Sequence, residues 1–383
     1  MSGNKSIFIS QPDLGEEEWH ALREPLMSGW VTQGPLVSKF EKSFSEFQHS
    51  TYSLATTSCT TALHLALESL GIGPGDEVIV PAFTWIATAN VVEYVGAKPV
   101  FCDIDFDSYN IDVTKIADCI SKRTKAIIPV HLFGRCADMD EINRMATEHR
   151  LYVVEDAACA IGSAYRGRKA GTLGDIGCFS FHPRKIVTTG EGGMCTTSDR
   201  KLHELMASLR NHGASISEEE RHLGPKPYIL PEFERLGFNY RMTDVQAAIG
   251  LVQMEKAGEL LAERKRRADW YREQLAGLEW LVLPDMPDEY EHSYQSFVCK
   301  VDEGIAGRSR NEIMEMLHQK GIHTRPGTHA VHMLAYYANK YELSPDDFPV
   351  AKSAYMHTIA IPLHSRMTEQ DYEYVVQTLK GIG

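Results

Sequence analysis

The chain has 383 residues, of which 43% are hydrophobic and 24% are charged. This length exceeds what one ordinary core requires and predicts two domains, and the composition is typical of a globular enzyme rather than of a disordered or fibrous chain. The formal net charge of −13 repels phosphate backbones, so we expect no nucleic-acid partner. No apolar run approaches membrane-spanning length, so we expect no membrane partner.

The eight cysteines are scattered, without a Cys-x-x-Cys pair, and no secretory signal peptide precedes them. This pattern predicts a reducing, cytoplasmic location. The sixteen histidines do not fall at ligand spacing with cysteine or carboxylate partners, so we expect no metal site.

In chain order, the first strong signal is a helix that starts near Ser58, Cys59 and Thr60. Leucines recur at positions i, i+4 and i+7 from Leu63, and Gly71 is well placed to end the helix. Free N–H groups and small hydroxyl side chains at a helix start can bind a phosphate group. The alternative is a simple N-cap, which Ser or Thr fills in a great many helices.

Short apolar runs alternate with helical patterns between residues 50 and 200. They predict strands at 77–81, 98–103, 125–133, 151–156 and 177–181. Such alternation predicts crossover units and a mostly parallel sheet, whose ligands gather at the carboxyl ends of the strands. Asp156 ends one of these strands, and Lys185 follows another.

A long helical pattern covers residues 243–275. Thr243 and Gln246 have capping-box spacing, and we expect the helix to carry the chain out of a large domain over 1–254. The charged run at 263–267 is interpreted as a solvated helix face. Helices with fewer strands follow and predict a smaller α+β domain over 255–383.

Lys185 lies in the segment CFSFHPRKIVTTGEGGM, between a predicted strand and a glycine-rich turn. A lysine amine can form a Schiff base with a carbonyl compound, although most lysines are solvated surface residues. An enzyme that uses pyridoxal phosphate (PLP) needs an amine, an anion at the pyridine nitrogen, a platform for the ring and a cradle for the phosphate. Lys185 could supply the amine, Asp156 the anion and the helix start at Ser58 the phosphate cradle.

These motifs, in this order, resemble the DegT/DnrJ/EryC1/StrS family of sugar aminotransferases, which has the PLP-dependent transferase fold of type I. The resemblance runs from GWVTQGP at 29–35 to the end of the chain, and its further segments lie at 57–67, 75–90, 129–134, 154–163, 178–194 and 237–250. It implies an α/β large domain with a mostly parallel mixed sheet flanked by helices, and a smaller C-terminal α+β domain. It also implies PLP, or its amine form PMP, as the cofactor.

By this resemblance, Lys185 is the Schiff-base lysine and Asp156 is the partner of the pyridine nitrogen. Trp85 stacks on the ring, although a tryptophan is also a frequent core residue. Cys159 stands where many relatives have glutamine or histidine near the ring hydroxyl. The phosphate contacts implied by the resemblance are Ser58, Cys59, Thr60 and Ser180. The resemblance further implies that Asn239 of a neighbouring subunit reaches the same phosphate, so that a homodimer shares its active sites.

Candidate substrate contacts lie in two segments. Trp30, Thr32 and Gln33 belong to a stretch that in relatives reaches the nucleotide-sugar pocket, and their alternative role is a packed turn before a helix. The segment 324–337 is expected to line the site from the neighbouring subunit, with His329 and His332 as its candidates. A lone histidine is more often structural.

Some relatives replace the lysine by histidine and catalyse dehydration, so the presence of Lys185 favours transamination. The resemblance then implies that L-glutamate donates nitrogen to a nucleotide-linked keto-deoxysugar, with an NDP-4-keto-6-deoxyhexose favoured. The amino sugar would serve surface polysaccharide or glycoside biosynthesis. A PLP-dependent sugar dehydratase of the same fold and a non-catalytic regulatory protein are the alternatives.

Overall fold

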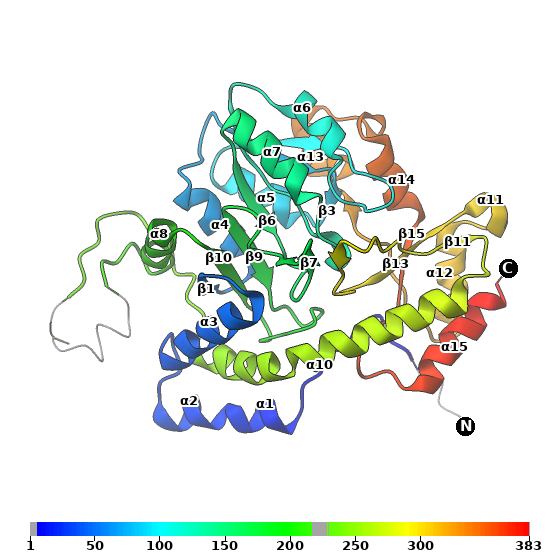
Figure 1. Ribbon diagram of the computed structural model, residues 1–383, viewed down its shortest axis with the longest axis horizontal. Coiled ribbons are helices and arrows are strands. Elements are labelled where there is room, and N and C mark those ends of the chain that lie inside the picture. Colours follow the sequence, from blue (N-terminus) through cyan, green and yellow to red (C-terminus); the bar gives the residue numbers. More distant parts are fainter. Residues whose placement is uncertain (1–5, 217–227, 229, 383) are drawn as a thin grey trace.

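The computed structural model describes residues 6–216, 228 and 230–382, which form a large central sheet covered by helices and a smaller sheet at one end (Figure 1). The α-helices are α1 (Glu16–Ala21), α2 (Arg23–Ser28), α3 (Pro35–Gln48), α4 (Cys59–Ser69), α5 (Ala87–Tyr94), α6 (Ile116–Cys119), α7 (Met139–His149), α8 (Arg200–Arg210), α10 (Asp244–Leu275), α11 (Glu303–Ala306), α12 (Arg310–Gln319), α13 (Ala335–Tyr341), α14 (Pro349–His357) and α15 (Glu369–Lys380). The strands are β1 (Tyr52–Thr56), β2 (Glu77–Pro81), β3 (Phe83–Thr84), β4 (Lys98–Cys102), β5 (Thr124–Ile127), β6 (Tyr152–Asp156), β7 (Ala164–Tyr165), β8 (Arg168–Lys169), β9 (Ile176–Ser180), β10 (Gly193–Thr197), β11 (Leu281–Val282), β12 (Tyr290–Glu291), β13 (Phe297–Val301), β14 (His329–Ala330) and β15 (Thr358–Ile361).

The central sheet has the strand order β1-β10-β9-β6-β5-β2-β4. Strands β9, β6, β5, β2 and β4 run parallel, and β10 is antiparallel to both of its neighbours. The prediction of a mostly parallel sheet is therefore confirmed. The run at 125–133 forms a shorter strand than predicted and ends at Ile127. Pro129 has no N–H to extend the ladder, and the chain then turns into a 3-10 helix at Leu132–Gly134.

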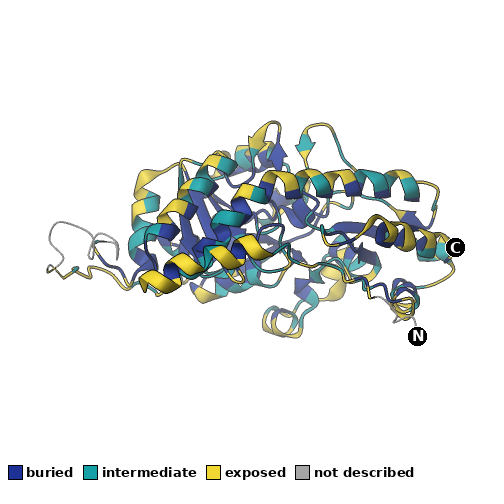
Figure 2. Ribbon diagram, turned by 90° about the horizontal axis from the view of Figure 1, so that it is seen from below, coloured by how far each residue is buried: buried dark blue, intermediate teal, exposed yellow. Residues whose placement is uncertain are grey.

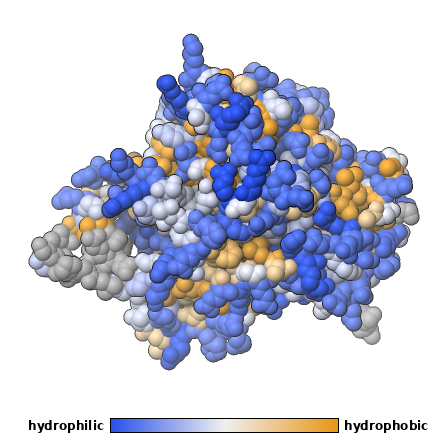
Figure 3. All heavy atoms as spheres, in the orientation of Figure 1, coloured by the Kyte–Doolittle hydropathy of each residue, from blue (hydrophilic) through white to orange (hydrophobic). Residues whose placement is uncertain are grey.

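Helices bury both faces of this sheet, which explains why its strands are almost continuously apolar (Figure 2). On one face, Leu63 and Leu67 of α4 belong to the same core cluster as Val92 of α5. On the other face, Phe40 of α3 lies in a second cluster with Ile142 of α7. Hydrophilic side chains cover most of the molecular face in Figure 3, with smaller apolar areas between them.

Helix α10 connects the two sheets. Thr243 accepts a hydrogen bond from the N–H of Gln246, and the Gln246 side chain accepts one from the N–H of Thr243, so the capping box is confirmed. Ala247 near the start of the helix packs in the core of the large sheet, whereas Tyr271 packs in the core of the antiparallel sheet β11-β13-β15. The predicted domain boundary at 254 thus falls inside one continuous helix.

The interpretation of 263–267 as a solvated face is wrong for two of its arginines. Arg264 and Arg267 are each only 8% exposed. Arg264 donates to the carbonyl oxygens of Tyr294 and Gln295, at 3.1 and 2.8 Å. Arg267 lies over the ring of Tyr372. The charged run faces the C-terminal sheet on one side. Carbonyl oxygens satisfy the guanidinium of Arg264, and the carboxylate of Glu263 pairs with the guanidinium of Arg267 at 2.8 Å.

Two segments outside the central unit return to it. Val331, Tyr337 and Ala351, from the region after β13, join the core cluster of the large sheet. Strand β14 pairs with β3, next to the predicted ring platform Trp85. In the described part of the chain, no helix is both long enough and apolar enough to cross a bilayer.

Candidate active site

A cavity of about 410 Å³ lies at the carboxyl ends of β6 and β9, where a parallel sheet is expected to bind its ligand. Asp156 from the end of β6, Lys185 from the loop after β9 and the first turn of α4 all line it. Ser58, Cys59, Thr60, Trp85, Cys159 and Ser180 share the same cavity wall. Eight residues selected from the sequence for one cofactor therefore surround one space.

Asp156 is a buried carboxylate that other groups hold in place. It is 5% exposed, and it accepts hydrogen bonds from the Thr88 hydroxyl at 2.8 Å and from the N–H of Ala158 at 3.2 Å. Burial has the largest effect on its pKa and raises it, and these hydrogen bonds with the charge of Lys185 offset that effect only in part. The hydrogen bonds and the charge of Lys185 thus offset only part of the cost of burying this carboxylate, so a cationic partner in the cavity would stabilise it further.

The amine of Lys185 lies 3.0 Å from the sulfur of Cys159. Burial is the largest influence on the pKa of Lys185 and lowers it, but Cys159, Cys59 and Asp156 act in the opposite direction. The net effect raises the pKa of Lys185. Without a ligand, the amine is therefore held as a cation among groups that favour its charge.

The start of α4 is both a capped helix end and an anion-binding surface. The Ser58 side chain accepts a hydrogen bond from the N–H of Thr61 at 3.1 Å. The Thr61 hydroxyl accepts one from the N–H of Ser58 at 3.0 Å. The N–H groups of Cys59 and Thr60 belong to the first turn, where a helix offers no internal acceptor. Because both residues line the cavity, their N–H groups can bind an anion there.

Gly193 of β10 allows the strand to approach this helix start. A Cβ at position 193 would lie 2.4 Å from the carbonyl carbon and oxygen of Ser58 and 2.6 Å from the nitrogen of Cys59. Such distances are well inside van der Waals contact, so any side chain would push α4 away from the sheet. The absence of a side chain thus fixes where the first turn lies.

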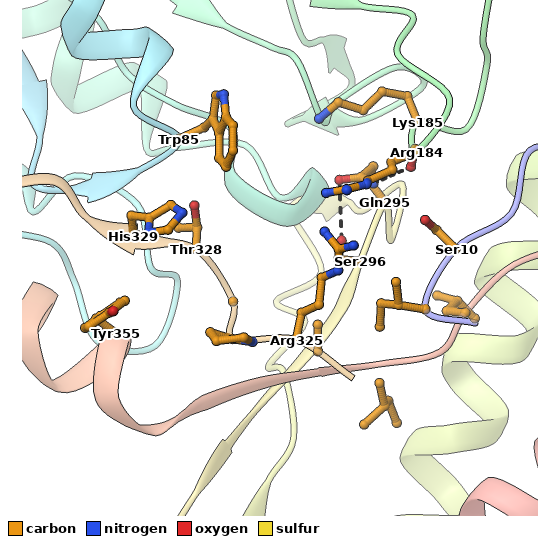
Figure 4. Close-up of a pocket in the computed structure, with 16 residues that line it drawn as sticks. Ser10, Trp85, Arg184, Lys185, Gln295, Ser296, Arg325, Thr328, His329 and Tyr355 are labelled. Atoms are coloured by element: carbon orange, nitrogen blue, oxygen red, sulfur yellow. Dashed lines mark hydrogen bonds between the residues drawn. The ribbon is translucent and has the colours of Figure 1, made fainter. Parts of the chain in front are cut away.

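Trp85 is not a core residue, because it is 59% exposed. His329 of β14 pairs with Thr84 of β3, which brings the His329 ring to 5.5 Å from the Trp85 ring. Figure 4 shows these two rings across the cavity from Lys185. The segment at 324–337 was expected to line the site from a neighbouring subunit, but His329 lines an adjoining cavity of its own chain, of about 380 Å³, which shares Trp85 and Lys185 with the first. Pairing of β14 with β3 within the chain places His329 there.

Five further residues selected from the sequence lie outside this cavity. Asn239 is exposed in the segment before α10. Thr32 accepts a hydrogen bond from the N–H of Asp244 at 2.9 Å, and the Trp30 indole donates to the carbonyl of Gln33 at 3.0 Å. These three N-terminal residues form a turn between α2 and α3. His332 is fully buried and packs on Phe348, so it does not reach this cavity.

Sequence reasoning missed several cavity residues. They are Arg184, Gln295, Ser296 and Thr328, together with Ser10 and Arg325 of the adjoining cavity. Thr88 was missed as well, and it is the buried hydroxyl that donates to Asp156 behind the cavity wall. Gln295, Arg325 and Thr328 come from the C-terminal part of the chain, and only the packing of that part against the sheet brings them here. Arg184 directly precedes Lys185, which was a usable signal. Among the described residues, no group of three or more His, Cys, Asp or Glu side chains could hold a metal ion.

Comparisons with known proteins agree along the whole chain. The model of the DegT/DnrJ/EryC1/StrS aminotransferase family matches residues 12–380. GDP-perosamine synthase of Caulobacter vibrioides is 40% identical, with 100% of each chain covered. The spore coat polysaccharide biosynthesis protein SpsC of Bacillus subtilis is 38% identical over 99% of this chain and 97% of its own. The PLP form of Spr1654 from Streptococcus pneumoniae, a candidate sugar aminotransferase, superposes with a TM-score of 0.90, at 30% identity and with 98% of each chain covered.

Proposed function

Because the chain belongs to the DegT/DnrJ/EryC1/StrS aminotransferase family, we propose that it uses PLP to transfer nitrogen from L-glutamate to the ketone of a nucleotide-linked keto-deoxysugar. An NDP-4-keto-6-deoxyhexose is the favoured acceptor, and surface polysaccharide or glycoside biosynthesis is the favoured purpose. The observation that carries this proposal is the shared cavity of Lys185, Asp156 and the first turn of α4.

The residues present fit PLP. Asp156 offers a buried, under-compensated anion for the pyridine nitrogen, and Trp85 offers an exposed ring beside it. The N–H groups of Cys59 and Thr60 would hold the phosphate, with the hydroxyls of Ser58 and Ser180 next to them. Cys159 would lie near the ring hydroxyl, because its sulfur already contacts the amine of Lys185.

Each residue has a distinct part in the reaction. When bound, PLP supplies an electron sink for the charge that develops at the α-carbon of the amino donor. Lys185 removes the proton from that carbon, as general base, and later returns a proton as general acid. Asp156 keeps its charge opposite the ring nitrogen, and Thr88 fixes the orientation of the carboxylate. Trp85 and His329 limit the positions that a substrate can take on the open side of the cavity.

The nucleotide-sugar part of the proposal is supported by the relatives. One of them is named a GDP-perosamine synthase and another a spore coat polysaccharide biosynthesis protein. We propose His329 as a substrate contact from the same chain. Trp30, Thr32 and Gln33 are proposed as contacts to the sugar nucleotide in the site of a second subunit.

We further propose a homodimer in which Asn239 of one subunit reaches the phosphate in the partner's site. Asn239 is exposed and does not line the cavity of Lys185 in its own chain, which supports this assignment. We place the enzyme in the cytoplasm, because all eight cysteines are free thiols in the structure.

The test is direct. Purified protein with PLP should have a near-visible absorbance band that changes when glutamate is added, and the product from a keto-sugar nucleotide should carry nitrogen derived from the donor. Mass spectrometry with ¹⁵N-glutamate detects that nitrogen. Lys185→Ala should abolish both the absorbance change and the product. Full activity in Lys185→Ala, or a dehydrated product without new nitrogen, would contradict the proposal.

A further inference from the structure

Two arginines whose guanidinium groups have no partner among the described residues line the cavity that adjoins the Lys185 cavity. Arg184 and Arg325 both line it, and Figure 4 displays their side chains between Lys185 and the C-terminal segment. In the described part of the chain, neither guanidinium group has a hydrogen bond or an ion pair, and only the backbones of these two residues are bonded. Among the described residues that line this outer region, none is Asp or Glu. A protein with a net charge of −13 thus carries a locally positive wall here.

The arginine pair lies between two adjoining spaces. On one side is the cavity that contains Lys185, Trp85 and His329. On the other side, the same two arginines line a second, outer cavity together with Phe8 and His323, among others. A molecule that extends from Lys185 to the outer cavity must therefore pass the two guanidinium groups.

The outer cavity has a defined wall. The N-terminal segment pairs with the stretch after α12, through hydrogen bonds from the N–H of Ile7 to the carbonyl of Gly321 at 2.8 Å and from the N–H of His323 to the carbonyl of Ile7 at 2.9 Å. This pairing stacks the rings of Phe8 and His323, whose centroids are 5.1 Å apart with an interplanar angle of 22°. Phe8 is 52% exposed, so an aromatic surface is open to a ligand.

We propose that Arg184 and Arg325 bind the diphosphate of the nucleotide-sugar substrate, and that the nucleoside extends toward Phe8 and His323. This inference rests on the proposed function. A nucleotide sugar carries its diphosphate between the sugar and the nucleoside, and the arginine pair lies between the reactive lysine and the aromatic surface. Guanidinium groups bind phosphate oxygens through paired hydrogen bonds, and a flat aromatic surface suits a base.

The carboxylates of the amino donor are the competing ligand for this site, because they are also anions. A diphosphate distributes its charge over two phosphoryl groups and so matches two separate guanidinium groups. Burial first, and then the charge of Arg325, lower the pKa of Arg184. The two arginines therefore repel each other, and a ligand with two negative groups relieves that repulsion at both of them.

Binding of nucleoside diphosphates to the PLP-loaded enzyme tests the assignment without requiring turnover. Isothermal titration with GDP, UDP and guanosine would be compared among wild type, Arg184→Gln, Arg325→Gln and the double variant. We expect each single change to weaken GDP and UDP binding by about tenfold and to leave guanosine binding unchanged. Arg325→Lys keeps the charge and should lose less. Arg23→Gln, an exposed position on α2, is the matched control.

A second measurement separates the diphosphate from the donor. The absorbance change with glutamate alone should be the same in Arg184→Gln and Arg325→Gln as in wild type. Equal GDP affinity in wild type and the double variant would overturn the inference, as would a wild type that binds neither GDP nor UDP. Loss of the glutamate response with intact GDP binding would also overturn it and would assign the pair to the donor. Nitrogen incorporation by the wild type tests the proposed function independently of all these outcomes. Both arginines are exposed, and their guanidinium groups have no partner in the part of the chain that the structure describes, so thermal unfolding of the variants should match that of wild type.

Discussion

The thiol of Cys159 contacts the amine of Lys185 and contributes to its raised pKa. The sulfur lies 3.0 Å from the amine, and it is among the groups that raise the pKa of Lys185 against the effect of burial. Only the unprotonated amine attacks an aldehyde. A cysteine at position 159 therefore makes the free amine scarcer at a given pH.

Cys159→Ala should accordingly lower the pKa of Lys185, because burial then acts with less opposition. When PLP is added to the cofactor-free protein, the pH at which incorporation reaches half its maximal rate should move downward. Stopped-flow absorbance over a range of pH measures this midpoint. Cys119→Ala, at a thiol outside the cavity, should leave it unchanged. An identical pH profile for Cys159→Ala and wild type would show that the thiol does not control the amine.

The buried charge of Asp156 lowers the stability of the cofactor-free protein, although cofactor binding requires that charge. Its pKa in the folded protein is raised, chiefly by burial, so the charged form destabilises the cofactor-free fold at a pH above that value, and the penalty disappears as the pH falls. Asp156→Asn should therefore not lower the melting temperature of the cofactor-free protein at neutral pH. Turnover should fall by about ten- to a hundredfold, the worth of one charged hydrogen bond. Calorimetry together with steady-state kinetics checks both statements, and a strong loss of stability would mean that the carboxylate is structural.

At the scale of elements, the contact between β10 and α4 positions the phosphate-binding turn. Gly193→Ala would place a methyl carbon 2.4 Å from the backbone of Ser58, so the turn must shift. We expect PLP affinity to fall by at least about tenfold, and stability to fall by about 1–3 kcal/mol. Gly258→Ala is the matched control, because nothing lies within 4 Å of its Cβ, and it should stabilise α10 by about 0.5–1 kcal/mol. Fluorescence titration with PLP and thermal unfolding distinguish the two variants, and unchanged PLP affinity in Gly193→Ala would contradict the assignment.

Local patterns predicted the elements well where one physical requirement dominates. The strand at 77–81 and the helix at 243–275 were found from an apolar run and from a capping box. The same patterns failed where distant contacts decide, as at Arg264, whose charge is buried against carbonyl groups from a segment thirty residues away. A charged run on a helix gives no sign of the surface that will cover it.

Some residues of the candidate site could likewise be selected from local patterns, and others could not. Asp156 and Lys185 could be selected because strand ends of a parallel sheet meet at one edge. Gln295 could not, because nothing near it in the sequence distinguishes it from other loop residues, and Arg325 was not selected although it lies in the segment 324–337 that was expected to line the site. They reach the cavity only when the C-terminal sheet docks beside the large one.

At the scale of the whole molecule, both parts of the chain build the cavity, and α10 holds them together. The guanidinium of Arg264 on α10 donates to the carbonyl of Gln295, which itself lines the cavity. Arg264→Ala should remove this link and leave two carbonyls with weaker partners. We expect a loss of stability of about 1–3 kcal/mol together with a higher KM for the sugar nucleotide, while Arg266→Ala, at an exposed position of the same helix, should change neither. Denaturant unfolding and kinetics measure the two effects, and a KM unchanged from wild type would mean that α10 does not position the cavity wall.

The proposed dimer makes the strongest demand on the whole molecule, because Asn239 must act in a different subunit from the Lys185 that it serves. Lys185→Ala and Asn239→Ala should each be inactive or strongly impaired as homodimers. A heterodimer of the two variants, isolated with two affinity tags, has one site with both residues intact and one site with neither. It should recover about half of the wild-type activity if the site is shared between subunits. If Asn239 acted within its own chain, neither site of the heterodimer would be intact and activity would stay at the level of the homodimeric variants. The comparison needs no structure of the complex, and a wild-type sample prepared with the same two tags controls for the effect of the tags.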